Sequence, residues 1–272
     1  MTKRFFSAPF IAFMLCGTLI PACVIAYYGM TDRSGAFTLA NLVAIANGEH
    51  AKALGLSLLL AFASTVICLL LAFPLGLALK DSKLGKKGFM VFVFIFILPM
   101  WMNFLLRTMA WQVLLEKNGI INGMLAGIGL PALNIINTPA AVILGMVYDY
   151  LPFMILPIYN ALIKIDNNLI EAAYDLGASK SLVFRKVIVP LSVPGIVSGV
   201  TMVFVPSLTT FAISNMLGGG KVNLIGNIIE QEFTASSNWN LGSGLSLVMM
   251  IFIVISMAFI EKFDRNGEGN MI

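Results

Sequence analysis

Six long apolar segments constrain the fold of this chain more strongly than any other feature. They cover residues 5–28, 53–79, 89–111, 138–160, 187–213 and 242–260. Each is long enough to cross a bilayer, because about 20 apolar residues in a helix span the hydrocarbon core of roughly 30 Å. Only 11% of the 272 residues are charged, whereas a soluble domain carries about 25%. We therefore expect an all-α, polytopic membrane protein with six transmembrane helices, in which residues 1–272 form a single transmembrane domain.

The amino-terminal apolar segment has two interpretations. Lys3 and Arg4 precede it, as in a signal peptide, and residues 20–23 (Ile-Pro-Ala-Cys) faintly resemble a lipoprotein cleavage site. The apolar run continues to Tyr27 and Tyr28, however, and aromatic residues of this kind are typical of the membrane interface. We favour an uncleaved first span.

The distribution of basic residues predicts the orientation. If the amino terminus is cytoplasmic, five of the seventeen Lys and Arg residues lie on the outer side: Arg33, Lys52, Arg107, Lys117 and Lys221. The remaining twelve lie on the inner side. Because Lys and Arg concentrate in cytoplasmic loops, we expect a multi-pass protein of the bacterial plasma membrane with both termini in the cytoplasm.

Residues 120–136 are apolar but interrupted by Gly123, Gly127, Gly129 and Pro131. We expect an exterior helix at the membrane interface, followed by a turn. A seventh span here would invert every downstream segment and place the next cluster of basic residues outside, against the charge rule.

A short polar segment at about residues 161–190 separates the fourth span from the fifth. Asn168 stands three residues before Glu171, which fits a helix N-cap with its capping-box partner. Glu171 and Asp175 are four residues apart and share one helical face. The apolar residues of the opposite face are Leu169, Ala172, Ala173 and Leu176.

The same segment has a stop signal and a second start signal. Gly177 fits the position just past the helix end, where a left-handed conformation is needed. Ser179 or Ser181 can cap a second short helix that leads into the fifth span. The local pattern is equally consistent with a plain interfacial connector in which Glu171 closes its own cap.

The spacing of this segment resembles the EAA loop of permeases in the binding-protein-dependent ABC importer family. Glu-Ala-Ala at residues 171–173 is followed after three residues by Gly177, and after nine more by residues 187–190 (Val-Ile-Val-Pro). Val187 and Val189 stand where the family pattern has Ile and Leu. The resemblance implies a type I ABC importer permease architecture, in which this loop docks as a coupling helix into a cleft of the ATPase. It assigns ATPase coupling to Glu171, Ala172, Ala173, Asp175, Gly177 and Pro190.

Within that family, residues 97–111, 147–157 and 218–242 look like the B-type permease subunits of spermidine/putrescine importers. The similarity extends from about residue 50 to about residue 260, but permeases for other solutes share much of the pattern. It implies polyamine import by alternating access. The partners it implies are a homologous second permease subunit, a homodimer of ATP-binding subunits, an extracytoplasmic solute-binding protein, membrane lipids and a small cationic substrate.

The sequence contains no phosphate-binding loop of its own. Such a loop needs Gly-Lys followed by Ser or Thr, but the Gly-Lys pairs at residues 85–86 and 220–221 precede Lys87 and Val222. We therefore expect no enzyme activity in this chain, and ATP and magnesium to bind the partner. One histidine and three cysteines offer no metal-site spacing. The net charge of +4 follows membrane topology and does not indicate nucleic-acid binding.

Asp149 is the main candidate for contact with a solute. It lies eleven residues into the fourth span, which is roughly 16 Å at about 1.5 Å per residue. An ionisable residue at this depth costs free energy in the bilayer and is therefore a functional candidate. A carboxylate near aromatic rings can bind an ammonium group. The plain alternative is an interhelical hydrogen bond or an ion pair with Arg107. The full candidate path is Asp149, Tyr148, Trp101, Asn103, Thr108 and Phe153.

The last exterior loop provides a second candidate surface. Glu230, Glu232 and Trp239 are candidates for a gate or for contact with the delivery protein, although exposed acids are usually only solvated.

Two further function classes remain as rivals. One is a permease subunit of the same kind of ABC importer for another solute, such as an amino-acid derivative, a phosphonate or thiamine. The other is an ion-coupled secondary transporter, which would show internal repeats and helices broken near the midplane. A simple channel would give the polar segment no purpose.

Overall fold

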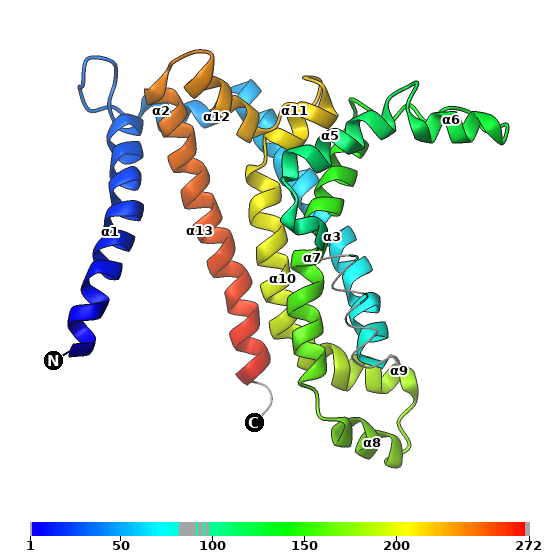
Figure 1. Cartoon of the computed structure of the whole chain (residues 1–272). Coiled ribbons are helices and arrows are strands. Elements are labelled where there is room, and N and C mark those ends of the chain that lie inside the picture. Colours follow the sequence, from blue (N-terminus) through cyan, green and yellow to red (C-terminus); the bar gives the residue numbers. More distant parts are fainter. Residues whose placement is uncertain (1, 82–90, 92–94, 96–97, 270–272) are drawn as a thin grey trace. The chain divides into compact units, whose positions relative to one another are not determined.

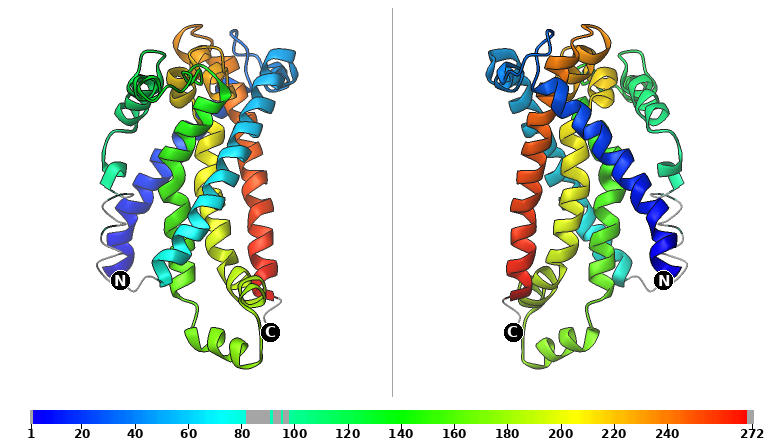
Figure 2. Two further views of the ribbon diagram at one scale, coloured as in Figure 1. Left: turned by 90° about the vertical axis from the view of Figure 1, so that its right-hand side faces the viewer. Right: turned by 90° about the vertical axis from the view of Figure 1, so that its left-hand side faces the viewer.

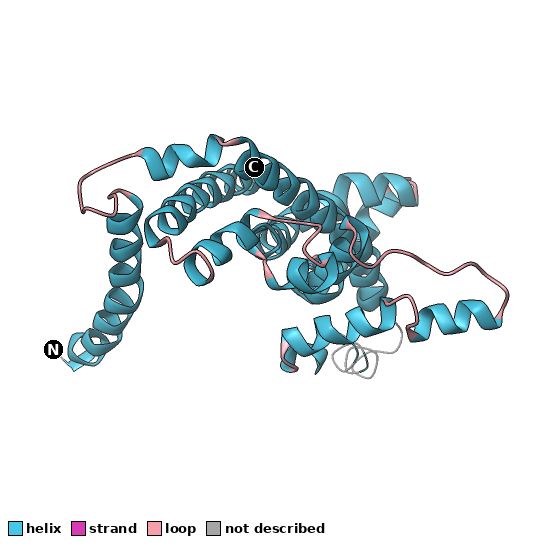
Figure 3. Ribbon diagram, turned by 90° about the horizontal axis from the view of Figure 1, so that it is seen from above, coloured by secondary structure: helices cyan, strands magenta, loops and turns pink. Residues whose placement is uncertain are grey.

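The structure is a computed structural model that describes residues 2–81, 91, 95 and 98–269. Within that part of the chain the regular secondary structure is helical, as Figure 3 shows, which confirms the expected all-α class. The chain divides into two compact units. Unit 1 contains Met1–Leu54 and Ile225–Ile255, and unit 2 contains Gly55–Leu224 and Ser256–Ile272.

The helices are labelled in Figure 1. Unit 1 holds α1 (Thr2–Gly29), α2 (Ala40–Val43), η1 (Ala44–Ala46), the first turns of α3 (Gly48–Asp81), α12 (Ile225–Thr234) and the first half of α13 (Trp239–Gly269). Unit 2 holds the rest of α3, η3 (Leu98–Trp101), α5 (Phe104–Leu115), α6 (Ile120–Gly127), α7 (Pro139–Ile163), α8 (Asn167–Asp175), α9 (Lys180–Val183), η4 (Phe184–Ile188), α10 (Val189–Thr209) and α11 (Ala212–Gly218).

Five helices are long and apolar enough to cross a membrane. Their spanning parts are Ala12–Gly29, Gly48–Lys80, Pro139–Ile163, Lys180–Thr209 and Trp239–Ile260. They coincide with five of the six predicted segments. The first part of the predicted span at 89–111 lies largely outside the described residues, which omit 82–90, 92–94 and 96–97. Its described remainder contains η3 and the start of α5.

The structure also bears on the predictions for the fifth span and for residues 120–136. The predicted fifth span at 187–213 ends earlier than expected, at Thr209, because Thr210 adopts an extended conformation that separates α10 from α11. In the ambiguous stretch 120–136, α6 has eight residues. A helix of that length cannot span a bilayer, which needs about 20 residues. A place for α6 at the membrane interface remains a prediction.

In unit 2, α7 is the central helix. Half of its apolar window is buried, the largest share among the five spanning helices. One end of its buried face, with Val142 and Met146, packs against Leu60 and Leu217. The other end, from Met154 to Leu162, packs in a second cluster with Cys68, Ala72 and Val203. Asp149 therefore lies on α7 between two apolar clusters, which accounts for its burial.

Small residues let α10 approach α7 closely, and Figure 2 shows the two helices side by side. Gly195 and Gly199 are four residues apart on α10 and face α7. A Cβ atom on Gly195 would lie 2.6 Å from the Pro157 carbonyl oxygen. Such pairs of small residues allow backbone contact in membrane proteins, where helix packing replaces the hydrophobic effect between helices.

In unit 1, two asparagine side chains join the end of α1 to the helices that follow. The Asn240 amide donates to the Thr31 carbonyl at 2.7 Å, and the Asn41 amide donates to the same oxygen at 2.9 Å. The next residue, Asp32, closes a tight loop. The Ser34 hydroxyl and the Ala36 amide donate to its carboxylate and lower the pKa of Asp32.

The close approach at Gly195 gives a first testable prediction. Gly195→Ala forces a methyl group against the Pro157 backbone, and overpacking of this kind costs about 1–3 kcal/mol. We expect a lower midpoint of thermal unfolding for the detergent-purified protein. Gly55→Ala is the matched control, because nothing lies within 4 Å of its added methyl group. A Gly195→Ala protein as stable as the control would contradict close packing of α7 on α10.

Candidate functional site

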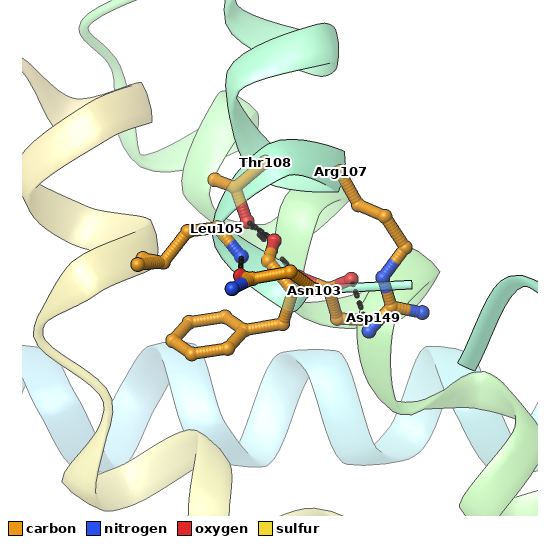
Figure 4. Close-up of polar contacts among 6 residues, drawn as sticks. Asn103, Leu105, Arg107, Thr108 and Asp149 are labelled. Carbon is orange, nitrogen blue, oxygen red and sulfur yellow. Dashed lines mark hydrogen bonds and ion pairs between the residues drawn. The ribbon is translucent and has the colours of Figure 1, made fainter. Parts of the chain in front are cut away.

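The best-defined polar cluster is a buried ion pair between α5 and α7, drawn in Figure 4. Nη2 of Arg107 lies 3.2 Å from Oδ1 of Asp149. The Thr108 hydroxyl lies 3.2 Å from Oδ2 of the same carboxylate, to which it donates. Relative exposure is 9% for Arg107, 1% for Thr108 and 3% for Asp149, so all three are closed off from solvent.

The cap of α5 sets the register of this cluster. The Asn103 side chain accepts a hydrogen bond from the Leu105 amide at 2.8 Å, so the helix begins at Phe104. An asparagine N-cap satisfies one of the free amides at a helix start. Arg107 and Thr108 follow about one turn after the cap, where both reach the same residue of α7.

The ion pair leaves part of its hydrogen-bonding capacity unused. Nε and Nη1 of Arg107 are buried and have no hydrogen-bond partner among the described residues. An arginine can hold a carboxylate with two parallel hydrogen bonds, but here Thr108 occupies the second oxygen. A buried pair is most stable when further hydrogen bonds complete it, so this one is incompletely stabilised.

The structure brings only part of the predicted path together. Asp149 and Thr108 meet, with Arg107 as the partner that the sequence offered as the plain alternative. Tyr148 makes an edge-to-face contact with Trp111, with ring centres 5.3 Å apart. The other predicted residues lie at more open positions: Asn103 is an exposed cap, Phe153 is 38% exposed and Trp101 is 86% exposed.

The second candidate site is the α8–α9 turn of unit 2. The prediction that Asn168 caps α8 is wrong. Asp166 is the N-cap, and its carboxylate accepts a hydrogen bond from the Asn168 amide at 2.9 Å. The helix therefore starts two residues earlier than expected, which places Glu171 beyond the capping-box position. Both residue types cap well, and the extended conformation of Asp166 decides between them.

The predicted turn at Gly177 is confirmed. Its φ of +79° is left-handed, and its amide donates to the Tyr174 carbonyl at 2.8 Å. The Ala178 amide donates to the Ala173 carbonyl at 3.0 Å. These two bonds form a Schellman motif, which closes a helix end with a residue in the left-handed region. Ser179, not Ser181, caps α9 by accepting from the Leu182 amide at 3.3 Å.

The outward surface of α8 combines acidic and apolar groups. Glu171, Ala172 and Asp175 are exposed, while Ala173 is half-buried. Leu169 is 53% exposed and Leu176 is 88% exposed. Leu176 therefore presents almost its whole apolar side chain at the Gly177 turn.

The turn continues into the membrane helix through irregular backbone. The five residues of η4 form a π-helix, and Pro190 occupies the start of α10. Proline lacks the amide that would continue an α-helical ladder, and π-helical turns are frequent at functional sites.

In unit 1, the predicted gate or delivery-protein residues lie on α12 and at the start of α13. The Thr234 hydroxyl donates to Oε1 of Glu230 at 3.1 Å. The Glu232 carbonyl accepts from the Asn238 amide at 2.8 Å. Trp239 is 54% exposed and packs edge-to-face on Phe233, with ring centres 5.5 Å apart. Their predicted role at a gate or delivery-protein surface stays a prediction.

Gly177→Ala tests the α8–α9 turn. A non-glycine residue in the left-handed region costs roughly 1–2 kcal/mol, so the Schellman bonds should open more often. Hydrogen exchange of the Ala178 amide should become roughly tenfold faster, since about 1.4 kcal/mol corresponds to a factor of ten. Gly123→Ala in α6 is the control, because its φ is not left-handed and nothing lies within 4 Å. Equal Ala178 exchange in both variants would refute the turn.

Known proteins resemble the chain over nearly its whole length. Residues 72–266 match the family of binding-protein-dependent transport system inner membrane components. The chain is 38% identical over 262 residues to the spermidine/putrescine transport system permease protein PotB of Haemophilus influenzae, covering 92% of this chain and 91% of that protein. It is 37% identical over 231 residues to PotB of Escherichia coli, covering 84% and 83%.

A solved structure shares the fold. It is the crystal structure of a bacterial ABC transporter involved in the import of the acidic polysaccharide alginate, which matches with a TM-score of 0.82 at 15% identity. The match covers 97% of this chain and 95% of the other. At this identity it supports the fold alone.

Proposed function

The chain belongs to the family of binding-protein-dependent transport system inner membrane components, and we propose that it imports polyamines as the permease subunit of an ATP-driven transporter. It is a multi-pass protein of the bacterial plasma membrane with an ABC importer permease fold. As a permease it is a non-enzymatic subunit of the transporter, and ATP hydrolysis lies in a partner subunit. The observation that carries the ATP-driven role is the α8–α9 turn, whose sequence and closed geometry fit a coupling element.

The turn supports a docking role through its exposed apolar side chains. Leu169 and Leu176 are seven residues apart and therefore two helical turns apart on one side of α8. Burial of a leucine side chain contributes about 1.5–3 kcal/mol. We propose that this side enters a cleft of the ATPase, with Glu171 and Asp175 at the rim and Gly177 fixing the turn. The coupling loop is then about residues 161–190, on the cytoplasmic side together with both termini.

The remaining partners follow from this role. The chain would pair with a homologous second permease to complete the path, and each permease would engage one subunit of an ATPase homodimer that binds ATP and magnesium. An extracytoplasmic protein would deliver the solute near Glu230, Glu232 and Trp239. Motion of α8 would pass through the π-helical η4 to α10, and packing of α10 on α7 would carry it to the ion pair.

We propose that Asp149 contributes the negative charge of the solute path. It is a carboxylate buried within a membrane-spanning helix, where a charge is kept only for a partner or a function. Thr108 orients the carboxylate, and Tyr148, Trp101, Asn103 and Phe153 would line the path in other conformations. The polyamine specificity rests on the names of the relatives, because a carboxylate alone accepts any small cation.

Leu176→Asp tests docking. The side chain is 88% exposed, so the substitution should leave the stability of the isolated chain unchanged. In the assembled transporter it should weaken binding of the ATPase at least tenfold, since loss of about 1.5 kcal/mol from one buried leucine corresponds to that factor. The readout is the amount of ATPase that co-purifies with the chain. Ile128→Asp, at a 71% exposed position outside the turn, is the control. Equal co-purification of both variants with the ATPase would argue against docking through α8.

Uptake by cells that depend on this transporter tests the solute. Labelled putrescine should enter in an ATP-dependent manner, and unlabelled spermidine should compete with it. Thiamine and a phosphonate serve as controls, because the first carries another type of cation and the second a negative charge. If either control competes while spermidine does not, the chain serves an importer for a different solute.

A further inference from the structure

We propose that Arg107 is an internal substitute for the transported cation, which occupies Asp149 until the solute displaces it. This inference rests on the proposed function, because it assumes that Asp149 belongs to the solute path. It adds a role for a residue that the sequence offered only as the partner in a structural ion pair.

The first argument is the geometry of the pair. Arg107 approaches Asp149 through Nη2 alone, at 3.2 Å from Oδ1. Its Nε and Nη1 atoms are buried without a hydrogen-bond partner in the described part of the chain. A permanent buried pair is expected to satisfy its remaining donors, since each unsatisfied one raises the energy of the folded state. The guanidinium is therefore held by charge with little geometric support, which suits a contact that exchanges.

The second argument is that the two oxygens of the Asp149 carboxylate have different partners. Thr108 holds Oδ2 at 3.2 Å, while Arg107 holds Oδ1. Departure of the guanidinium would leave Asp149 still oriented by Thr108, with Oδ1 free for a new cation. Thr108 is thus a positioning residue, and Arg107 is the part that moves.

The third argument is that the Arg107 guanidinium lies close to an exposed part of the chain, the start of α5. Arg107 lies one helical turn from the exposed cap residue Asn103, and the intervening Phe104 and Leu105 are 45% and 36% exposed. Long basic side chains place their charged head toward water while the stem stays on apolar surface. A change of rotamer could therefore carry the charge toward the open start of α5.

This substitution would keep an empty path neutral. A bare carboxylate among the apolar clusters of α7 would be costly, and the tethered cation removes that cost whenever no solute is present. The consequence is a weaker apparent affinity, because the solute binds only the fraction of molecules in which the pair is open. If the pair is closed about nine-tenths of the time, the apparent Kd is raised roughly tenfold.

The experiment is binding of labelled putrescine to the purified complex of both permeases with the ATPase. Arg107→Gln removes the charge with a similar side-chain length, so the Kd should fall roughly tenfold for the occupancy assumed above. Asp149→Asn should raise the Kd, and Arg107→Gln should then have no further effect in the Asp149→Asn background. Lys117→Gln is the control, because it removes the same charge at an exposed position just after α5 and should leave the Kd unchanged.

A structural ion pair would give a different pattern. Arg107→Gln would then leave the Kd of the assembled complex unchanged or raised, and either result would overturn the proposal. Arg107→Lys guards against failed assembly, because it keeps a buried cation on a side chain with fewer hydrogen-bond donors. Its Kd should also fall, by a smaller factor, and an unchanged Kd in an assembled Lys variant would likewise overturn the proposal.

The failure of this inference is separable from failure of the proposed function. A wild-type complex that binds and transports putrescine, combined with an Arg107→Gln Kd equal to that of wild type, refutes only the role of Arg107. Absence of polyamine transport by the wild-type transporter refutes the proposed polyamine function itself, whatever the variants do.

Discussion

The hydrocarbon core of a bilayer offers no water to unpaired polar groups, and this constraint governs the membrane-spanning part of the chain. Backbone amides and carbonyls must find partners within a helix, and charges must be paired or removed from the core. The long apolar helices meet the first requirement. Arg107 and Asp149 meet the second by contacting one another. The α8–α9 turn lies between two spanning helices and has neither their length nor their composition.

These features form a connected path within unit 2. The α8–α9 turn leads through η4 into α10, and the glycines of α10 bring it against α7. On α7, Asp149 separates the two apolar clusters, so a shift of α10 along α7 would change the surroundings of the ion pair. The α8–α9 turn, closed by two backbone hydrogen bonds, would serve the proposed coupling as a point of attachment, and the incompletely satisfied ion pair on α7 would serve it as a contact that exchanges.

Much of the fold follows from the sequence because span length and turn chemistry are local. Apolar length located five spanning helices, and the need for a left-handed residue identified Gly177. The cap of α8 was misplaced because Asp166 and Asn168 are both good N-caps, and only the backbone conformation distinguishes them. The partner of Asp149 could not be decided, since the side of α5 that faces α7 depends on packing. For the same reason the sequence grouped Trp101 with Thr108, although one is exposed and the other buried.

The most direct test of the account is the ATPase activity of the purified complex, with polyamine-loaded and polyamine-free binding protein compared side by side in lipid. An importer driven through the α8–α9 turn predicts hydrolysis that rises when the loaded protein is added and that depends on the presence of this chain. Unchanged hydrolysis in the intact complex, or polyamine accumulation by this chain alone along an ion gradient, would contradict the account.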